Sequence, residues 1–323
     1  MINRQGFTLI ELVITMALMI IVIGLSGPAY RTILSSVKGN NIENEVYQDI
    51  VNNLDLIRLD IEHAGFGLAR DETNLPIEWD ELNKVLQLRS VLNNTNQTTM
   101  GWALLDCTSA NQTIPSAGTC TGAPYIVNQK KTPCLQSMVL LNSSKNYAKL
   151  VTPTDLTCPL ATGLFVAYPY DSTANDQCVT GFCSRITYRL SAVNGTPASK
   201  TACAAGTSNL LREVGSNGLG GDTIMDCVAD FRVRFDIDND NNGVLDSTKA
   251  SALPAAASTG ALMDQVKNAE VIFLVQAGQR DDKLNSNPDT LVSGVTLSLA
   301  GVTNAKNYRW KVIKINGNPM SWQ

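Results

Sequence analysis

The feature that most constrains this chain is an apolar run near its start, from Phe7 to Gly27, which contains a single charged residue, Glu11. At about 1.5 Å per residue, such a run forms a helix roughly 30 Å long, which matches the hydrocarbon thickness of a bilayer. An ionised carboxylate in the middle of a bilayer costs at least about 2.5 kcal/mol on insertion scales. The sequence therefore predicts a membrane-spanning helix, with Glu11 as its candidate functional side chain.

A small residue precedes this apolar run, because Gly6 lies directly before Phe7. Secretory signals place their small-residue cleavage site after the apolar core, so this lead differs from an ordinary signal peptide. Gly6, Phe7 and the Thr-Leu-Ile-Glu that follows resemble the class III signal of type IV prepilins and type II secretion pseudopilins. The resemblance implies that a prepilin peptidase cuts between Gly6 and Phe7 and methylates the new amine of Phe7. It also implies that the helix stays in the chain as the assembly stalk.

The same resemblance gives Glu11 a role between subunits. In a filament core with little water, a carboxylate and a protonated N-terminal amine each lack a partner, and pairing them relieves two desolvation penalties at once. We therefore expect Glu11 to pair with the Phe7 amine of a neighbouring subunit and to set the register between the two. The alternative interpretation is a plain membrane anchor with an accidental acid.

The helical pattern continues beyond Pro28. Proline removes one backbone hydrogen bond and its ring clashes with the preceding turn, so we expect the helix to bend or loosen there, at the kink of the resembled family. Apolar residues then recur every three or four positions over 33–61, which is typical of an amphipathic helix, and Gly65 and Gly67 supply the stop. The sequence thus predicts one long helix over 7–64.

Alternation of apolar and polar residues predicts an antiparallel sheet after the helix. Asp230 and Arg232, for example, alternate with Phe231 and Val233. This period of two indicates one wet face and one buried face, and we expect the buried face to lie on the second half of the helix. The predicted strands are 138–141, 164–168, 185–190, 210–214, 227–235, 271–276, 295–299 and 308–315. A short helix is predicted around 79–88.

The expected fold class is α+β, and the resemblance implies the type IV pilin fold: a long N-terminal helix, transmembrane in its first half, packed on an antiparallel sheet with large disulfide-stapled loop insertions. The stretch 58–66 also resembles the helix end of PilW-like minor pilins. The expected parts are a prepilin leader (1–6), the transmembrane and assembly half of the helix (7–27), its amphipathic half (28–65), and a globular β-rich domain (66–323) with loop insertions at 90–183.

Eight cysteines lie beyond the helix, and they are Cys107, Cys120, Cys134, Cys158, Cys178, Cys183, Cys203 and Cys227. The count is even, no Cys-x-x-Cys pair occurs and the chain has one histidine, so disulfides in an oxidising compartment fit better than zinc sites. Eight cysteines allow about 105 pairings, so the connectivity is not deducible from sequence. Bridges between nearest neighbours are the simplest hypothesis: Cys107 with Cys120, Cys134 with Cys158, Cys178 with Cys183, and Cys203 with Cys227.

One loop has the composition of a calcium site. Residues 238–246 fit the pattern D-x-[DN]-x-[DN]-G, with a further acid three positions after Gly243. Ca²⁺ takes about six to eight oxygen ligands, and the glycine allows the sharp turn that brings alternate side chains together. The expected ligands are Asp238, Asp240, Asn242, the carbonyl of Val244, and Asp246. Lys249 stands where an EF-hand has its bidentate glutamate, so the pattern is that of a shorter calcium loop, and the alternative is an Asp- and Asn-rich turn without metal.

Composition argues against other classes of function. The net charge is −4 and no cluster of Lys and Arg occurs, so we expect no nucleic-acid partner. The only histidine is His63, and no nucleophile or phosphate-binding motif accompanies it. We therefore expect a structural protein and not an enzyme.

The resemblance implies a minor pilin of a type IV pilus, which a prepilin peptidase processes and which joins other minor pilins and the major pilin in an initiation or tip complex. The expected location is the inner membrane, with the globular domain in the periplasm and later on the pilus at the cell surface. The alternatives are a J-type minor pseudopilin of a type II secretion system and a calcium-dependent adhesin at the pilus tip.

Overall fold

The computed structural model describes residues 9–68, 70, 75–91, 103–106, 138–141, 147–150, 164–169, 184–191, 203–215, 221–256, 258–286 and 291–319. For 25, 27–29, 31–52 and the strands between 103 and 169, it describes the backbone alone.

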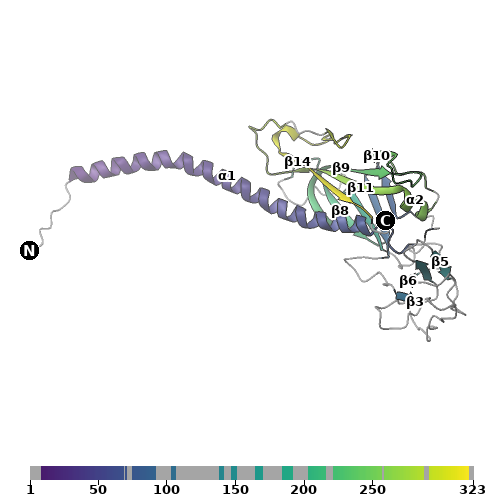
Figure 1. The fold of residues 1–323 in the computed structure, drawn as a ribbon. Coiled ribbons are helices and arrows are strands. Elements are labelled where there is room, and N and C mark those ends of the chain that lie inside the picture. Colours follow the sequence, from purple (N-terminus) through teal and green to yellow (C-terminus); the bar gives the residue numbers. More distant parts are fainter. Residues whose placement is uncertain are drawn as a thin grey trace, which may run out of the picture.

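One long helix forms the N-terminal part of the described chain. Helix α1 (Leu9–His63) has 55 residues, which corresponds to roughly 80 Å. It continues through Pro28 and is drawn as one gently curved helix that leaves the globular part at one end (Figure 1). Gly65 (φ 84°) and Gly67 (φ 72°) follow its last turn with positive φ, a conformation that glycine adopts without a Cβ penalty. The predicted long helix and its glycine stop are confirmed.

The globular part, which we call the head, is built on one antiparallel sheet. Its strand order is β1-β2-β7-β8-β9-β11-β14, and β10 pairs with β9. The strands are β1 (Ile77–Asp80), β2 (Val85–Ser90), β7 (Ser184–Leu190), β8 (Ser208–Val214), β9 (Asp222–Ile237), β10 (Ser247–Ala250), β11 (Val266–Gln276) and β14 (Trp310–Gly317). A short helix, α2 (Thr259–Gln265), precedes β11, and the 3-10 helix η1 (Ala305–Asn307) precedes β14.

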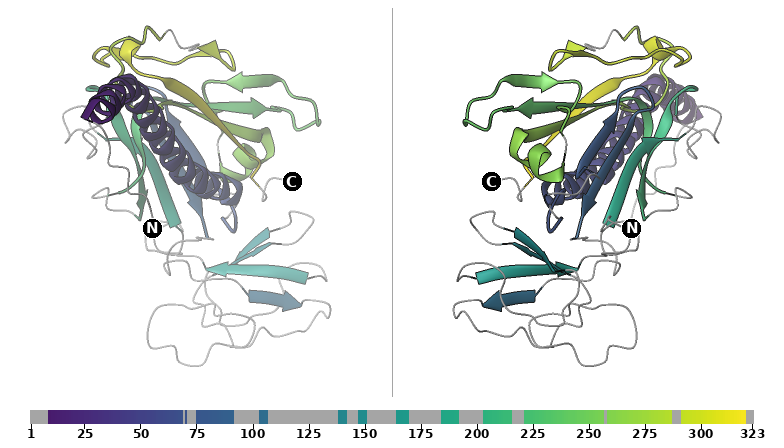
Figure 2. Two further views of the ribbon diagram at one scale, coloured as in Figure 1. Left: turned by 90° about the vertical axis from the view of Figure 1, so that its left-hand side faces the viewer. Right: turned by 90° about the vertical axis from the view of Figure 1, so that its right-hand side faces the viewer.

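Two smaller sheets accompany the main one. A four-stranded sheet of order β3-β6-β4-β5 lies in the region predicted as loop insertions. Its strands are β3 (Ala103–Asp106), β4 (Met138–Leu141), β5 (Tyr147–Leu150) and β6 (Leu164–Pro169). A two-stranded hairpin joins β12 (Leu291–Val292) to β13 (Val295–Thr296). Figure 2 shows the four-stranded sheet below the main sheet and separate from it.

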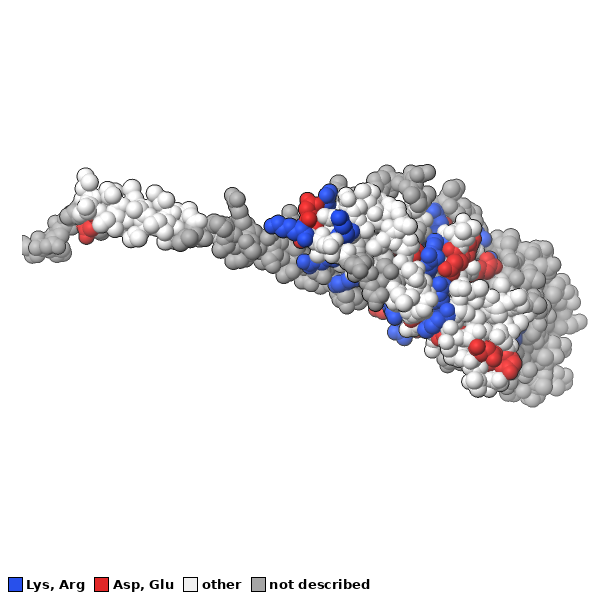
Figure 3. Space-filling model, turned by 90° about the horizontal axis from the view of Figure 1, so that it is seen from above, with Lys and Arg blue, Asp and Glu red and all other residues white. Residues whose placement is uncertain are grey.

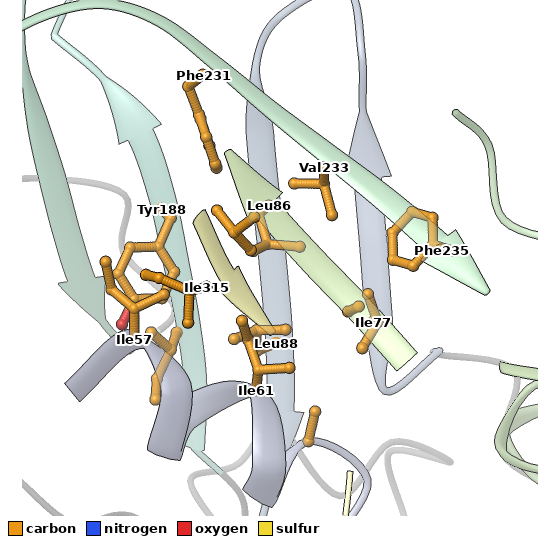
Figure 4. Packing of buried hydrophobic residues seen from close by; sticks show 14 of the residues in the cluster. Ile57, Ile61, Ile77, Leu86, Leu88, Tyr188, Phe231, Val233, Phe235 and Ile315 are labelled. Carbon is orange, nitrogen blue, oxygen red and sulfur yellow. The ribbon is translucent and has the colours of Figure 1, made fainter. Parts of the chain in front are cut away.

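The main sheet packs against the larger of two hydrophobic clusters, and the last turns of α1 lie against the same cluster. Ile57 and Ile61 of α1 are fully buried in this core. Phe231 stacks on Phe273 at 5.1 Å between ring centroids, and Trp79 meets Phe231 edge-to-face at the same distance. Figure 4 shows these helix residues facing side chains from several strands. The expectation that the sheet packs on the second half of the helix is confirmed.

The predicted short helix over 79–88 is wrong, because this segment is the β1–β2 hairpin. Ile77 pairs with Leu88 across the hairpin. Asp80 closes the turn, since its Oδ1 accepts the backbone N–H groups of Leu82 and Asn83, each at 2.9 Å. Aspartate side chains compete with helical hydrogen bonding in this way and favour turns.

The outer face of β9 was expected to be wet, and there the prediction fails. Asp230 and Arg234 are buried on this face. Asp230 accepts a hydrogen bond from Lys84 Nζ at 3.0 Å and one from the backbone N–H of Ser298 at 2.8 Å. Glu81, next to β1, accepts one from Arg234 Nη1 at 3.0 Å. The β1–β2 turn and the segment after β13 thus cover β9, and the covered charges are paired, as buried charges must be.

A second buried charge network joins α1 to the sheet. Asp60 of α1 accepts hydrogen bonds from Arg212 Nε at 2.7 Å and Nη2 at 3.1 Å, and one from the Tyr188 hydroxyl at 2.5 Å. All three residues are buried. Burial disfavours the charged guanidinium, but the bonds and charge of Asp60 outweigh this, so the pKa of Arg212 lies above its usual value. Burial and the Asp60 charge both raise the pKa of Tyr188 well above its usual value, so its hydroxyl stays a donor.

Two contacts fix the direction of the sheet along α1. Asn53 Nδ2 donates to the carbonyl of Ile224 at 2.5 Å, near the start of β9. Gly317, at the end of β14, lies so close to Ile61 that an added Cβ would come within 2.4 Å of the Ile61 side chain. The start of β9 therefore lies toward the N-terminus of α1. Strands β9 and β14 are both antiparallel to β11 and so run in the same direction, which places the start of β14 at this end as well. We call this the proximal end of the head, and the opposite end, with the 238–246 loop, the distal end.

Replacing Arg212 by Met should destabilise the fold by about 3–5 kcal/mol, because it leaves the Asp60 carboxylate buried without its cation. The matched control is Arg58→Met, which removes an exposed pair with Glu62 one turn away on α1 and should cost less than about 0.5 kcal/mol. The measurement is urea unfolding of the full chain in detergent. The double variant Asp60→Leu/Arg212→Met should recover most of the loss, and equal effects of Arg212→Met and Arg58→Met would contradict the assignment.

The Glu81 carboxylate should give the head a defined pH dependence. Burial opposes its ionisation, but hydrogen bonds from Trp79 and Arg234 and the charges of Arg234 and Arg232 prevail and lower the pKa of Glu81. A carboxyl with a lowered folded-state pKa stabilises the fold above its unfolded-state pKa of about 4.3, and this contribution is lost as the pH falls through the folded-state value.

Glu81→Gln should therefore cost at most about 1 kcal/mol at neutral pH, because the side chain is 40% exposed. The difference from the parent protein should shrink as the pH falls from about 5 to 3. Melting temperatures across this range measure it, with Asp282→Asn at an exposed pair as the control. A difference that stays constant with pH would exclude the Glu81 carboxylate as its source.

Candidate functional site

The predicted assembly residues lie at the start of α1. Gly6 and Phe7 are outside the described residues, so the predicted cleavage and methylation sites are not seen. Glu11 lies in α1 and is exposed. Large apolar side chains surround it and are also exposed: Leu9, Ile10, Leu12, Val13, Ile14, Met16, Leu18, Met19, Ile20, Ile21, Val22 and Ile23. The structure thus presents Glu11 as an acid on an otherwise apolar, uncovered helix surface.

Among the described residues, no helix combines the length and the apolar character needed to cross a membrane.

The predicted calcium loop lies at the distal end of the head, between β9 and β10. Asp238 is fully buried at the base of the loop, where its backbone N–H donates to the carbonyl of Gln265 at 2.8 Å. The N–H of Asp246 donates to the carbonyl of Ile237 at 2.8 Å and closes the loop from its other side. Gly243 has φ 88°, so it makes the sharp turn that its position in the pattern predicts.

Three of the predicted ligands converge. One carboxylate oxygen each from Asp238, Asp240 and Asp246 lies within 4.8 Å of the others. The two Asp238 oxygens accept the backbone N–H groups of Asn242 at 3.1 Å and Gly243 at 2.9 Å. Burial raises the pKa of Asp238, but these N–H groups and the charge of Lys267 outweigh it, so the pKa lies below its usual value. The loop therefore holds three carboxyl groups close together, and the most buried one favours its charged form.

The other two predicted ligands contribute to the loop itself. Asn242 Oδ1 accepts the backbone N–H of Val244 at 2.7 Å, and Asn242 Nδ2 donates to Asp240 Oδ2 at 2.8 Å. The Val244 side chain is exposed. The residues present fit a hard cation through their three carboxylates, while Asn242 supports the turn in the way expected of a metal-free Asp- and Asn-rich loop.

Two lysines near the loop bear on this site. Lys249, at the EF-hand glutamate position, lies 3.6 Å from carboxylate oxygens of both Asp236 and Glu270, so it neutralises acids of the neighbouring strands. Sequence reasoning missed Lys267, whose Nζ lies 3.6 Å from Asp238 Oδ2 and donates to Asn241 Oδ1 at 2.6 Å. Lys267 belongs to β11, far along the chain, and only the pairing of β11 with β9 brings it here.

One of the four hypothetical disulfides lies in the described residues and is confirmed. Cys203 and Cys227 are bridged, with their Cα atoms 5.3 Å apart. Cys227 has φ 56° and lies where the register of β9 shifts against β8, so the bridge fastens an irregular part of the strand. The remaining hypothetical pairs, formed by Cys107, Cys120, Cys134, Cys158, Cys178 and Cys183, lie outside the described residues.

Comparison with known proteins adds to this description. Residues 1–27 match the family model of the prokaryotic N-terminal methylation motif. Among solved structures, a type IV-like pilin from Thermus thermophilus matches with a TM-score of 0.38 and 9% sequence identity, over 84% of this chain and 94% of that chain. No curated protein sequence matches this chain. The chain thus carries the N-terminal methylation motif at the start of one long helix that ends against an antiparallel sheet, and this arrangement supports the resemblance to type IV prepilins and pseudopilins.

Proposed function

We propose that this protein is a minor pilin of a type IV pilus, processed between Gly6 and Phe7 and built into the complex that starts or tips the filament. The observation that carries the proposal is the methylation motif over residues 1–27. The large head supports a minor role, because a major pilin that repeats thousands of times is usually smaller. The proposed role is structural, with no catalytic step.

The division of α1 supports assembly through its N-terminal half. Among the described side chains, contacts of α1 with its own sheet begin at Asn53, whereas the side chains of Leu9–Ile23 are all exposed. Exposed apolar area costs about 25 cal/mol per Å² relative to burial, so such a surface needs another apolar environment. A bilayer before assembly and the helices of other subunits after assembly supply it in turn.

Glu11 then determines where along a neighbouring helix this apolar surface can pack. Apolar packing alone tolerates sliding of one helix along another, whereas a carboxylate in a dry environment requires a cation at one place. The amine of a processed Phe7 on a neighbouring subunit is a cation in the same dry layer. The pairing therefore defines the axial register between subunits.

The partners in this proposal are a prepilin peptidase, other minor pilins and the major pilin, with a tip adhesin as a further candidate. The location is the inner membrane, with the head in the periplasm, and then the pilus. The same features fit a J-type minor pseudopilin of a type II secretion system, because both machines use this N-terminus. The identity of the pilins that co-purify with the native chain separates the two.

We also propose that the 238–246 loop binds Ca²⁺. The three convergent carboxylates favour this function over a plain turn, because like charges within 4.8 Å repel unless a cation lies between them. Lys267 supplies part of this positive charge at the Asp238 side, so we expect the cation to be held mainly from the side of Asp240 and Asp246. A calcium-dependent adhesin at the tip would place such a loop at the distal end, where the structure has it.

Glu11→Ala should enter the membrane as the parent does and be cut before Phe7, yet fail to join the pilus complex. The reason is that the apolar segment is kept while the partner of the Phe7 amine is lost. Co-purification with the other pilins measures assembly, and mass spectrometry of the N-terminus checks processing. Thr15→Ala is the control: it removes a polar group one turn away that bonds only within its helix, to the carbonyl of Leu12 at 2.9 Å, and should assemble normally. Normal assembly of Glu11→Ala would remove the proposed role, and an uncut parent chain would refute the prepilin assignment.

Calcium should bind the full chain in detergent with a Kd of about 10⁻⁴ M or a few decades tighter, and millimolar calcium should raise the melting temperature. Asp240→Asn/Asp246→Asn should abolish both effects, because it removes two of the three carboxylates. Asp282→Asn, an equal charge change on an exposed acid outside the loop, should leave both unchanged. Calorimetric titration measures the binding, and the absence of heat and of a rise in melting temperature in the parent chain would show that the loop is a metal-free turn.

A further inference from the structure

The 238–246 loop contains a chemically labile side chain, Asn242, which is followed by Gly243. An asparagine before glycine is prone to attack on its side-chain amide by the next backbone nitrogen, because glycine has no Cβ to hinder the approach. The sequence has this pair at 194–195, 217–218, 242–243 and 316–317. The structure describes the last two pairs, and it holds them in different ways.

The loop holds the Asn242 amide close to the nitrogen that would attack it. Asn242 Oδ1 accepts the backbone N–H of Val244 at 2.7 Å. This bond closes a ring of atoms that includes both Cγ of Asn242 and N of Gly243, so the two reacting atoms stay on the same side of the turn. Asn242 Nδ2 donates to Asp240 Oδ2 at 2.8 Å, and both residues of the pair are exposed to water. The loop therefore orients the amide and leaves it open to hydrolysis.

The surrounding groups also suit the chemistry of the attack. The Val244 N–H donates to Asn242 Oδ1, the atom on which negative charge develops when the nitrogen of Gly243 attacks, and such a donor stabilises an oxyanion. The Gly243 N–H donates to Asp238 Oδ2 at 2.9 Å, so a carboxylate lies where the proton of this nitrogen has to go. A nucleophile, an oxyanion donor and a proton acceptor thus meet at one amide.

The pair Asn316–Gly317 is held in the opposite way. It lies in β14, where Asn316 pairs with Glu270 and Gly317 with Ala269 of β11. The extended backbone of a strand directs the next nitrogen away from the side chain. Gly317 is also buried against Ile61, which leaves no room for a ring at this place. Ring closure at Asn316 therefore requires the end of β14 to leave the sheet.

The loop belongs to the acidic end of the head. Residues 236–270 contain six acidic and two basic residues, whereas residues 280–314 contain six basic and three acidic residues. Figure 3 shows Lys and Arg gathered where α1 leaves the head, and clusters of Asp and Glu toward the other end. A further negative charge in the loop would add to a region that already attracts cations.

We propose that Asn242 is a site of spontaneous deamidation, and that its conversion to aspartate gives the 238–246 loop a fourth carboxylate and tighter binding of Ca²⁺. In the first step a bond forms between N of Gly243 and Cγ of Asn242, and the Cγ–Nδ2 bond breaks. Nδ2 leaves as ammonia with the proton of the Gly243 N–H. Water then opens the cyclic imide at either carbonyl carbon, so no oxidant or further reactant is needed.

The two openings have different consequences for the loop. One gives an aspartate at position 242, where the pattern D-x-[DN]-x-[DN]-G accepts either residue. The affinity of calcium loops rises with the number of charged ligands, so this product should bind Ca²⁺ more tightly. The other gives isoaspartate, which lengthens the backbone of the loop and disrupts the turn at Gly243. The calcium part of the inference rests on the proposed function, whereas the deamidation itself does not.

Mass spectrometry of the full chain tests the site. The chain is kept for weeks in detergent at neutral pH, with a chelator, in water enriched in a heavy oxygen isotope that marks each hydrolysed imide. Deamidation at Asn242 should be at least about tenfold faster than at Asn316, because Asn316 reacts only after local opening of its strand. In urea the two sites should react at rates within about threefold of each other, because neither is then held by structure.

The comparison of folded and unfolded chain decides the outcome. Folding should leave the rate at Asn242 unchanged or increase it, and should slow the reaction at Asn316. No deamidation at Asn242 in the folded chain, or an equal slowing of both sites by folding, would overturn the inference.

The variant Asn242→Asp supplies the aspartate product in pure form. Calorimetric titration should give it a Kd for Ca²⁺ about tenfold lower than that of the parent chain. The matched control Asn241→Asp adds the same charge one residue away, where Asn241 Oδ1 lies 2.6 Å from Lys267 Nζ, and should change the Kd by less than about threefold. An unchanged Kd in Asn242→Asp would overturn the calcium part of the inference.

The results separate this inference from the proposed function. Deamidation at Asn242 without calcium heat in the parent chain or in Asn242→Asp supports the modification site and refutes the calcium function. Calcium heat in the parent chain without deamidation at Asn242 supports the calcium function and overturns the inference.

Discussion

The attachment of α1 to the sheet through Asp60 is the interaction on which the rest of the structure depends. The helix is 55 residues long, yet the described side chains that hold it to the head lie in its last turns. Apolar contacts of Ile57 and Ile61 supply burial, but burial alone does not define a direction or a depth. A carboxylate that receives a guanidinium and a hydroxyl at 2.5–3.1 Å has one position, so Arg212 and Tyr188 define where the helix lies on the strands.

Because a buried ion pair is costly to form and costlier to break, such a network favours one geometry more than it adds stability. That property suits the proposed role in a filament. There the N-terminal half of α1 would have to hold the head in one position, and a purely apolar joint would allow repacking at small cost. The buried charges of β9, on the other face of the sheet, have the same effect. There Lys84 pairs with Asp230 and Glu81 pairs with Arg234, which fixes the β1–β2 turn against β9.

The parts that the sequence predicted correctly are those encoded by local patterns. The helix stop at Gly65 and Gly67, the strand at β9 and the sharp turn at Gly243 all depend on a few neighbouring residues. The hairpin at β1–β2 was missed because its residues, Trp79 above all, acquire strand structure through contact with Phe231. Propensity is a weak signal in short segments, where tertiary contacts override it.

The site was predictable to the same extent. The three carboxylates of the 238–246 loop come together as their spacing predicts, because all three belong to the same short loop. The cation beside Asp238 could not be predicted, because Lys267 reaches it through the pairing of two strands. Asp60 and Arg212 are separated by 152 positions in the sequence, and no local pattern around either residue indicates that they pair.

The charge separation between the two ends of the head follows from topology. Strand β9 ends in the acidic loop, and the antiparallel return of β11 carries the chain back to the opposite end, where the basic segment before β14 begins. Strand β11, with 11 residues, thus places oppositely charged connections about 36 Å apart, too far for them to neutralise each other through solvent. Each end keeps its own charge, and the Asp60 network that fixes α1 to the sheet decides which end lies toward the N-terminus of the helix.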